Sequence, residues 1–154
     1  MENKPDCFIK EIQGHYSRHR GLVFVHMPDE TRVNAAVAFD ELYDKDKRNL
    51  RTRFDHWLGG GVHKKYFHGW DKSEYQGRYV NCFVFKLTVK RSETRFYGYL
   101  CHPNLKAPRF EVCLLILHTC KDQWETKEAD LKFVKEIGED PRVKKALADL
   151  CSLQ

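Results

Sequence analysis

The sequence lacks the long apolar runs, repeats and linkers that would point away from an ordinary globular domain. No apolar run approaches the roughly 18 residues that a membrane-spanning helix needs, so we expect no membrane partner. No internal repeat, low-complexity tract or linker rich in Pro, Gly and Ser divides the chain. A chain of 154 residues with 42% hydrophobic and 32% charged residues can bury a core without disulfides or a metal. We therefore expect a single domain over residues 1–154.

The cysteines give no sign of a disulfide framework. Nothing that resembles a signal peptide precedes them, they are scattered, and several lie in apolar runs: Cys7, Cys82, Cys101, Cys113, Cys120 and Cys151. This distribution favours reduced thiols in a cytoplasmic protein. A zinc site is an alternative, formed across neighbouring strands by Cys82, Cys101, His102, Cys113, His118 and Cys120. Because their spacing matches no CxxC arrangement, we expect no metal and no cofactor.

Positive charge is concentrated in the middle of the chain. The formal net charge is +5, but residues 47–109 hold 14 Lys or Arg against 4 Asp or Glu, a local excess of ten. The same segment is rich in rings, namely Trp57, Tyr66, Phe67, Trp70, Tyr75, Tyr79, Tyr97 and Tyr99. Cations hold phosphates and rings stack on unpaired bases, so this mixture favours nucleic-acid binding. A solvated basic surface is the alternative reading.

The hydrophobic pattern predicts an α+β fold. We expect short strands over 7–12 and 21–26, then a helix over about 31–43. A second helix has one apolar stripe, Leu50, Phe54, Trp57 and Leu58, and ends at Gly59 to Gly61, where a left-handed C-cap is wanted. The two helices form a hairpin that turns near residues 44–46.

Strands and two closing helices follow the hairpin. Strands over 81–90, 95–101 and 110–118 form an antiparallel meander. A helix over about 126–137 places Ala129, Phe133 and Ile137 on one side, and Asp140 and Pro141 begin another helix. The expected architecture is a helical hairpin packed on a small antiparallel sheet, with C-terminal helices.

The meander carries an unusual row of cations. If residues 91–94 form a four-residue loop, the pairs are Lys90 with Arg95, Thr88 with Tyr97, and Lys86 with Tyr99, all on one face. The other face then carries Phe83, Phe85, Leu87, Val89, Phe96 and Leu100. Like charges placed opposite each other cost on the order of a few tenths to 1 kcal/mol, which makes sense if an anion binds between them. Alternatively, the long side chains splay into water.

Two further segments carry side chains suited to chemistry. After the third strand, His118 can transfer a proton, Lys121 can hold a phosphate, and Trp124 can stack on a base. The alternative is that His118 satisfies a backbone group while Trp124 covers the core. The segment HKKYFHGW, residues 63–70, is either a nucleic-acid loop or a lid with Phe67 and Trp70 buried and its lysines in water.

Three segments together resemble the RelE, ParE and HigB superfamily of bacterial toxins, most closely its phage-derived HigB-like branch. They are LRTRFDHWLGGG, FKLTVKRSETRFYGYL and VCLLILHTCKDQWETKEADLKFVKEI. The resemblance makes residues 30–137 a RelE-like core, 1–29 an N-terminal strand region and 138–154 a C-terminal helical extension. The chain departs from the superfamily in its Cys120-Lys121 pair, where paired lysines are usual, and in lacking a proline before the last helix.

Members of that superfamily commonly cut mRNA, often in the ribosomal A site. The resemblance therefore implies a toxin of a type II toxin–antitoxin system, a metal-independent endoribonuclease with mRNA, the ribosome and a cognate antitoxin as partners. It implies that Arg95 contacts the scissile phosphate, that Lys121 is the basic residue after the last core strand, and that Lys86, Lys90 and His118 fall at polar positions of the site. ParE-like relatives act on DNA gyrase, so a non-catalytic RelE-fold protein that blocks a nucleic-acid-related target is the alternative.

Metal-free RNA cleavage needs a base for the 2′-OH, charge stabilisation for the phosphorane and an acid for the 5′ oxygen. We expect Arg95 to stabilise the phosphate, Lys86 or Lys90 to act as the base and His118 as the acid. Lys121 and Tyr99 would orient the RNA. The expected RNA-binding residues are Tyr97, Tyr99, Trp124 and Arg53.

Overall fold

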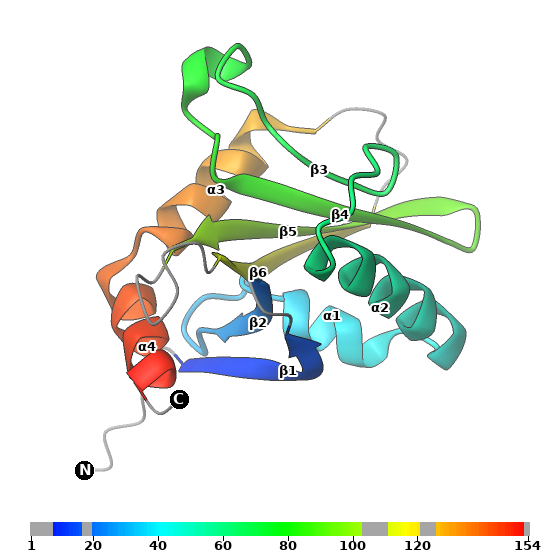
Figure 1. Cartoon of the computed structure of the whole chain (residues 1–154), viewed down its shortest axis with the longest axis horizontal. Coiled ribbons are helices and arrows are strands. Elements are labelled where there is room, and N and C mark those ends of the chain that lie inside the picture. The colour runs from blue at the N-terminus through cyan, green and yellow to red at the C-terminus, as the bar shows by residue number, and fades with distance from the viewer. Residues whose placement is uncertain (1–7, 17–19, 103–110, 121–125, 153–154) are drawn as a thin grey trace.

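A single six-stranded sheet organises the chain, with strand order β1-β2-β6-β5-β4-β3 (Figure 1). The computed structural model describes residues 8–16, 20–102, 111–120 and 126–152. The strands are β1 (Phe8–Tyr16), β2 (Arg20–His26), β3 (Phe67–Gly69), β4 (Cys82–Val89), β5 (Ser92–Cys101) and β6 (Glu111–Cys120). The helices are α1 (Ala35–Glu41), α2 (Asp44–Leu58), the 3-10 turn η1 (Tyr75–Gly77), α3 (Glu128–Gly138) and α4 (Pro141–Ser152).

The α+β class and the β4-β5-β6 meander are confirmed, but the expectation of a purely antiparallel sheet is wrong. Strand β2 pairs with β6 in parallel, with Leu22 opposite Cys113 and Phe24 opposite Leu115. Both strands are continuous apolar runs that are buried on their two faces, which is the pattern of a central parallel pair. The N-terminal strands therefore extend the meander into one larger mixed sheet.

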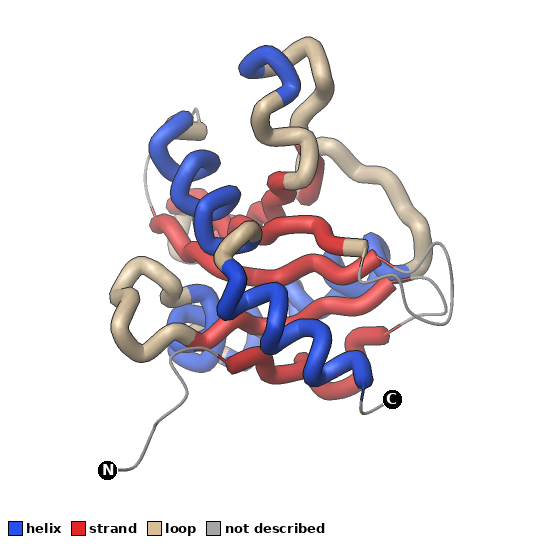
Figure 2. Tube along the Cα trace, turned by 90° about the vertical axis from the view of Figure 1, so that its left-hand side faces the viewer, coloured by secondary structure: helices blue, strands red, loops and turns tan. Residues whose placement is uncertain are grey.

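Helices cover both faces of the sheet. We call the side covered by α1 and α2 the hairpin face; its core includes Leu22, Phe24, Phe54, Phe85 and Phe96. We call the side covered by α3 and α4 the C-terminal face; its core includes Val23, Val25, Val84, Tyr97 and Leu131. In Figure 2, α3 and α4 cross in front of the strands. The alternation of β2 side chains between the two cores explains why every position from Leu22 to Val25 is apolar.

The helical hairpin is confirmed, with shifted boundaries. Helix α1 begins at Ala35 because Asn34 is held by β6: its side-chain oxygen accepts from the backbone N–H of His118 at 2.7 Å. The hairpin turns at Leu42 and Tyr43, ahead of the predicted 44–46. The predicted stripe of α2 is buried. The residue with left-handed backbone is Gly60, at φ 86°, one position after the C-cap.

The register predicted for the β4-β5 hairpin is wrong by four residues. Lys90 and Arg91 form a two-residue turn with φ of 49° and 70°, so the strands run closer to the tip than predicted. Lys86 therefore faces Arg95 instead of Tyr99, and Lys90 leaves the ladder. A shift by an even number keeps each side chain on its predicted face.

The face opposite the predicted apolar side is largely buried as well, instead of polar and exposed. Cys82, Val84, Tyr97 and Tyr99 belong to the core beneath α3 and α4. Only its end toward the β4-β5 turn, at Lys86 and Arg95, keeps a polar character.

The C-terminal helices confirm one prediction and correct another. The carboxylate of Asp140 accepts from the backbone N–H of Arg142 at 2.8 Å, and Pro141 begins α4, as predicted. Helix α3 buries Leu131, Val134 and Ile137 instead of a stripe through Ala129 and Phe133. Phe133 is half-buried under the Arg32 guanidinium, 4.4 Å from the ring centroid.

None of the helices in the described ranges combines the length and apolarity needed to cross a bilayer. Four described cysteines are free: Cys82, Cys101, Cys113 and Cys120. Burial raises the pKa of Cys82 to about 12 and that of Cys101 to about 11, so both remain thiols at neutral pH. Within the part of the chain that the structure describes, no three His, Cys, Asp or Glu side chains are grouped to hold a metal ion.

Candidate functional site

A group of polar side chains lies on the C-terminal face near the β4-β5 turn. Lys86 on β4 stands directly opposite Arg95 on β5. His68 on β3 pairs with Val84, a residue of the C-terminal core, so His68 lies on the same face and one position diagonal to Lys86. We call His68, Lys86 and Arg95 the basic triad. Three short strands of one sheet thus bring three basic groups together from positions 27 residues apart along the chain.

Arg95 is 7% exposed, and each of its three guanidinium nitrogens makes a polar contact. Its Nε donates to Glu93 Oε2 at 2.8 Å, and Nη2 lies 2.7 Å from the same oxygen. Its Nη1 donates to Thr126 Oγ1 at 2.6 Å and to the Tyr97 hydroxyl at 3.3 Å. Burial alone would lower the Arg95 pKa, but the hydrogen bonds to Tyr97 and Glu93 outweigh it and raise the pKa. Arg95 is therefore a permanent, oriented cation.

The pKa values of Lys86 and His68 are lowered, whereas that of Arg95 is raised. Partial burial, and then the charge of Arg95, lowers the pKa of Lys86 below its ordinary value. Burial also lowers the pKa of His68, and the charges of Lys86 and Arg95 add to this effect. His68 Nδ1 lies 2.9 Å from the Gly69 carbonyl oxygen, to which a neutral ring donates its Nδ1 proton. A neutral His68 then keeps Nε2 as a proton acceptor.

The burial pattern predicted for a lid over residues 63–70 is confirmed. Phe67 is 3% exposed and Trp70 is 7% exposed, whereas Lys64 and Lys65 are exposed. Trp70 packs over the Tyr97 ring at a centroid distance of 6.3 Å and lies 5.0 Å from the His68 ring. The lid therefore forms one wall beside the basic triad.

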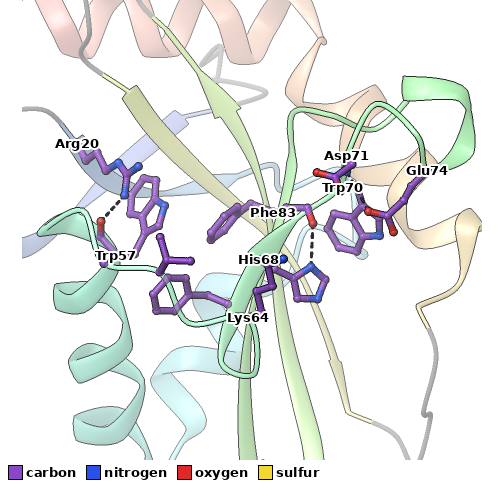
Figure 3. Close-up of a pocket in the computed structure, with 12 residues that line it drawn as sticks. Arg20, Trp57, Lys64, His68, Trp70, Asp71, Glu74 and Phe83 are labelled. Carbon is purple, nitrogen blue, oxygen red and sulfur yellow. Dashed lines mark hydrogen bonds between the residues drawn. The ribbon is translucent and has the colours of Figure 1, made fainter.

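The lid also borders a pocket of about 560 Å³ at the β3 edge of the sheet (Figure 3). Aromatic side chains line its floor and ends, and His68 stands on its rim. The pocket and the basic triad therefore share one side chain.

Cations continue from the triad over the hairpin side of β3. Arg53 stacks on Tyr66 at 4.1 Å from the ring centroid, and its guanidinium donates to the backbone carbonyl of Lys86. His63 stacks on Tyr66 at 4.1 Å between centroids. Exposed cations nearby in the sequence are Lys45, Arg48, Arg51, Lys64 and Lys65. This arrangement of rings and cations is one that holds a polyanion with unpaired bases.

Several residues predicted to share the site lie elsewhere. His118 pairs with Phe96, and its ring packs 4.9 Å from the Phe96 ring, on the hairpin face. Its backbone N–H and carbonyl are bonded to the Asn34 side chain, which fixes this strand end against the start of α1. The acid role predicted for His118 beside Arg95 is therefore wrong. Burial, opposed by the charge of Glu41, lowers its pKa.

Lys90 and Tyr99 are also drawn away from the triad. Lys90 Nζ lies 3.4 Å from the Tyr43 hydroxyl, on the turn beside the helical hairpin. The Tyr99 hydroxyl donates to Glu139 Oε1 at 2.9 Å, and its ring is 7% exposed under α3, so it offers no stacking surface to RNA. Tyr97 lies at the triad but is 1% exposed, and its hydroxyl oxygen accepts a hydrogen bond from Arg95 Nη1. Lys121 and Trp124 lie outside the described residues.

The sequence reasoning missed three groups at this site: His68, Glu93 and Thr126. Period-two alternation places Glu93 and Arg95 on one face of a strand, so that pair had a local signal. His68 lies inside the segment 63–70, where the sequence pattern gives it no role distinct from that of its neighbours. Thr126 has no local signal, because it reaches Arg95 from 31 positions away.

Comparison of the chain with protein-family models, with curated proteins and with solved structures gives no match.

Proposed function

We propose that this protein is a metal-independent endoribonuclease that cleaves mRNA, with the basic triad as its catalytic centre. One observation carries the proposal: Lys86 and Arg95 face each other directly across two strands, with His68 on the same face. Opposed like charges on a sheet cost free energy, which Glu93 offsets for Arg95 and which a bound anion would offset for Lys86. A phosphodiester is an anion that this pair fits, and the rings and cations around Tyr66 suit the adjoining nucleotides.

The chemistry divides among the three side chains. His68 Nε2 accepts the 2′-OH proton, and the 2′ oxygen attacks phosphorus. Arg95 and Lys86 stabilise the negative charge of the phosphorane. Lys86, whose lowered pKa makes it a better acid than an ordinary lysine, gives its proton to the departing 5′ oxygen. The products are a 2′,3′-cyclic phosphate and a 5′-hydroxyl end, so the mechanism requires RNA and leaves DNA intact.

The biological assignment is part of the same proposal. Part of the order of elements supports a RelE-like arrangement: a helical hairpin, then a three-stranded meander, then a helix, with β1 and β2 before the hairpin and β3 and η1 inserted ahead of the meander. We accordingly propose a type II toxin that acts on ribosome-bound mRNA in the cytoplasm, inhibits translation and is neutralised by a cognate antitoxin. Helix α4 extends beyond this core and packs near β1.

A second function has an observation in its favour. Glu93 lies 2.7 Å from Arg95 and already compensates its charge, and Thr126 takes another guanidinium donor. A site closed in this way suits a non-catalytic protein of the same fold that blocks a nucleic-acid-related target such as gyrase.

Cleavage by the purified protein separates the two functions. Wild-type protein is incubated with ribosomes and mRNA in the presence of a chelator, and new 5′ ends are mapped. The endoribonuclease predicts discrete new 5′-hydroxyl ends that are lost in Lys86→Met. Lys72→Met is the matched control, since Lys72 is an exposed lysine that follows the lid and lies outside the triad. Absence of new ends with folded wild-type protein would refute the endoribonuclease and leave the blocking protein.

A further inference from the structure

The pocket at the β3 edge has the dimensions and walls of a small-ligand site. Its volume of about 560 Å³ falls within the roughly 300–1,000 Å³ usual for such sites. Trp57, Phe67, Trp70 and Phe83 contribute its aromatic lining. In Figure 3, Phe83 lies between the Trp57 end and the Trp70 end. Each of these rings is at most 8% exposed, so they give the pocket a rigid apolar floor instead of open stacking faces.

The two ends of the pocket carry opposite charge. Arg20 lies at the Trp57 end, where it donates to the Trp57 carbonyl at 2.6 Å and its guanidinium stands 4.7 Å from the Trp57 ring centroid. Glu111 Oε1 lies 3.5 Å from Arg20 Nε and offsets its charge, which leaves the exposed ammonium of Lys64 to attract an anion. Asp71 and Glu74 lie at the opposite end, beside Trp70 (Figure 3). The pocket is therefore suited to a ligand with an anionic part and a hydrogen-bond-donating part.

The carboxylate end is held in place. Glu74 Oε1 accepts from the backbone N–H of Asp71 at 3.0 Å, which fixes one oxygen and orients the other. A carboxylate accepts only, so the matching ligand edge must present donors. Among the four RNA bases, guanine alone presents two adjacent donors, its N1–H and N2–H, on the Watson–Crick edge. Adenine and cytosine present one donor beside an acceptor, and uracil flanks its single donor with acceptors.

The pocket is continuous with the basic triad through His68. His68 lines the pocket, and the charges of Lys86 and Arg95 help to lower its pKa. Because His68 belongs to both, a nucleotide next to a phosphate at the triad lies on the side of the triad that faces the pocket. A guanine nucleotide combines the phosphate that Lys64 favours with the donors that Glu74 and Asp71 favour.

We infer that the pocket at the β3 edge is a guanine-binding subsite for the RNA strand. The inference rests on the proposed RNA substrate and adds its base preference. The purine rests against the apolar floor, Glu74 and Asp71 accept from its Watson–Crick edge, and Lys64 contacts a flanking phosphate.

The test measures equilibrium binding by fluorescence anisotropy. The probes are 2′-O-methyl pentanucleotides UUGUU, UUAUU and UUCUU, which lack the 2′-OH nucleophile and cannot be cut by the proposed mechanism. A bidentate contact discriminates bases by about 1–3 kcal/mol, which is about 5- to 150-fold in affinity. We expect UUGUU to bind at least about tenfold more tightly than UUAUU or UUCUU.

Two variants locate the preference. Glu74→Gln replaces an accepting oxygen with a donating amide on an exposed side chain, and we expect it to remove the preference for UUGUU while leaving UUAUU binding unchanged. Asp40→Asn on α1 removes an equal charge from an exposed site and serves as the matched control, with the preference retained. Lys64→Ala should weaken all three probes alike and lower the slope of log affinity against log salt by about one.

Each outcome is decisive. Equal affinity for the three probes, preference for another base, or an unchanged preference in Glu74→Gln would overturn the guanine subsite. Preference for UUGUU by a protein that leaves no new mRNA ends would uphold the subsite and refute the endoribonuclease. Cleavage of mRNA by a protein that binds the three probes equally would uphold the endoribonuclease and refute the guanine subsite.

Discussion

Replacement of Arg95 by alanine is the sharpest perturbation of the basic triad. The side chain makes polar contacts to Glu93, Thr126 and Tyr97, and all of them disappear in the variant. If Arg95 stabilises the phosphorane, its loss should lower the cleavage rate by about 10²- to 10³-fold, the range measured for single electrostatic donors in other enzymes.

The cost to stability is smaller than the number of contacts suggests. The Glu93 side chain is 34% exposed, so water replaces part of its lost interaction. The Tyr97 hydroxyl still donates to Thr126 Oγ1 at 3.4 Å. Hydrogen bonds to charged groups are worth about 1.5–3 kcal/mol each, and with these compensations we expect Arg95→Ala to lower the free energy of unfolding by about 2–3 kcal/mol in total.

Two measurements separate the effects. Urea unfolding followed by tryptophan fluorescence gives the change in stability, and single-turnover cleavage of a labelled RNA below the unfolding midpoint gives the change in rate. Arg95→Lys keeps the charge but loses the planar fork, and we expect it to recover stability better than rate. A folded Arg95→Ala protein that cleaves at the wild-type rate would refute the catalytic role of this side chain.

Three more predictions follow from the structure. The cleavage rate should rise with pH along a limb whose midpoint lies below the ordinary histidine pKa of about 6.5, because protonation removes the acceptor on His68. It should fall again along a limb whose midpoint lies below the ordinary lysine pKa of about 10.5, as Lys86 loses its proton; an alkaline limb alone in a measured pH–rate profile would exclude His68 as the base. Lys90→Ala should leave the rate within about twofold of wild type, since Lys90 lies in the turn beside Tyr43; a loss near that of Lys86→Met would contradict the observed register. Gly98→Ala should destabilise the protein by about 1–3 kcal/mol in urea unfolding, because a Cβ there would lie 2.5 Å from the Cys113 sulfur; unchanged stability would show that the bulge at this position is loosely packed.

Several features of the fold were predictable because their causes are local. Period-two alternation assigned Phe83, Phe85 and Phe96 to one face of the meander, and that assignment survives the register error because the error is even-numbered. The apolar stripe of α2 and the Asp140 cap of α4 likewise depend only on residues a few positions apart. Burial of Phe67 and Trp70 in the lid also followed from their own apolar surface.

The turn at residues 90 and 91 shows where local reasoning fails. A two-residue hairpin turn with positive φ usually carries Asn or Gly, and Lys90 and Arg91 give no such signal. The sequence therefore favours a four-residue loop over residues 91–94, which places Lys90 in the ladder opposite Arg95. Pairing over the full length of β4 and β5 outweighs the unfavourable backbone of these two residues.

The chain by itself determined which residues are apolar, where α2 and α4 run, and that its centre is strongly basic. Only the tertiary structure decided that Lys86 meets Arg95, that His68 joins them in place of His118, and that Thr126 closes over the guanidinium. These outcomes depend on strand register, on the parallel pairing of β2 with β6 and on contacts between residues dozens of positions apart. Periodicity records which face a side chain takes, but the free energy that selects its neighbours is a property of the whole packed sheet.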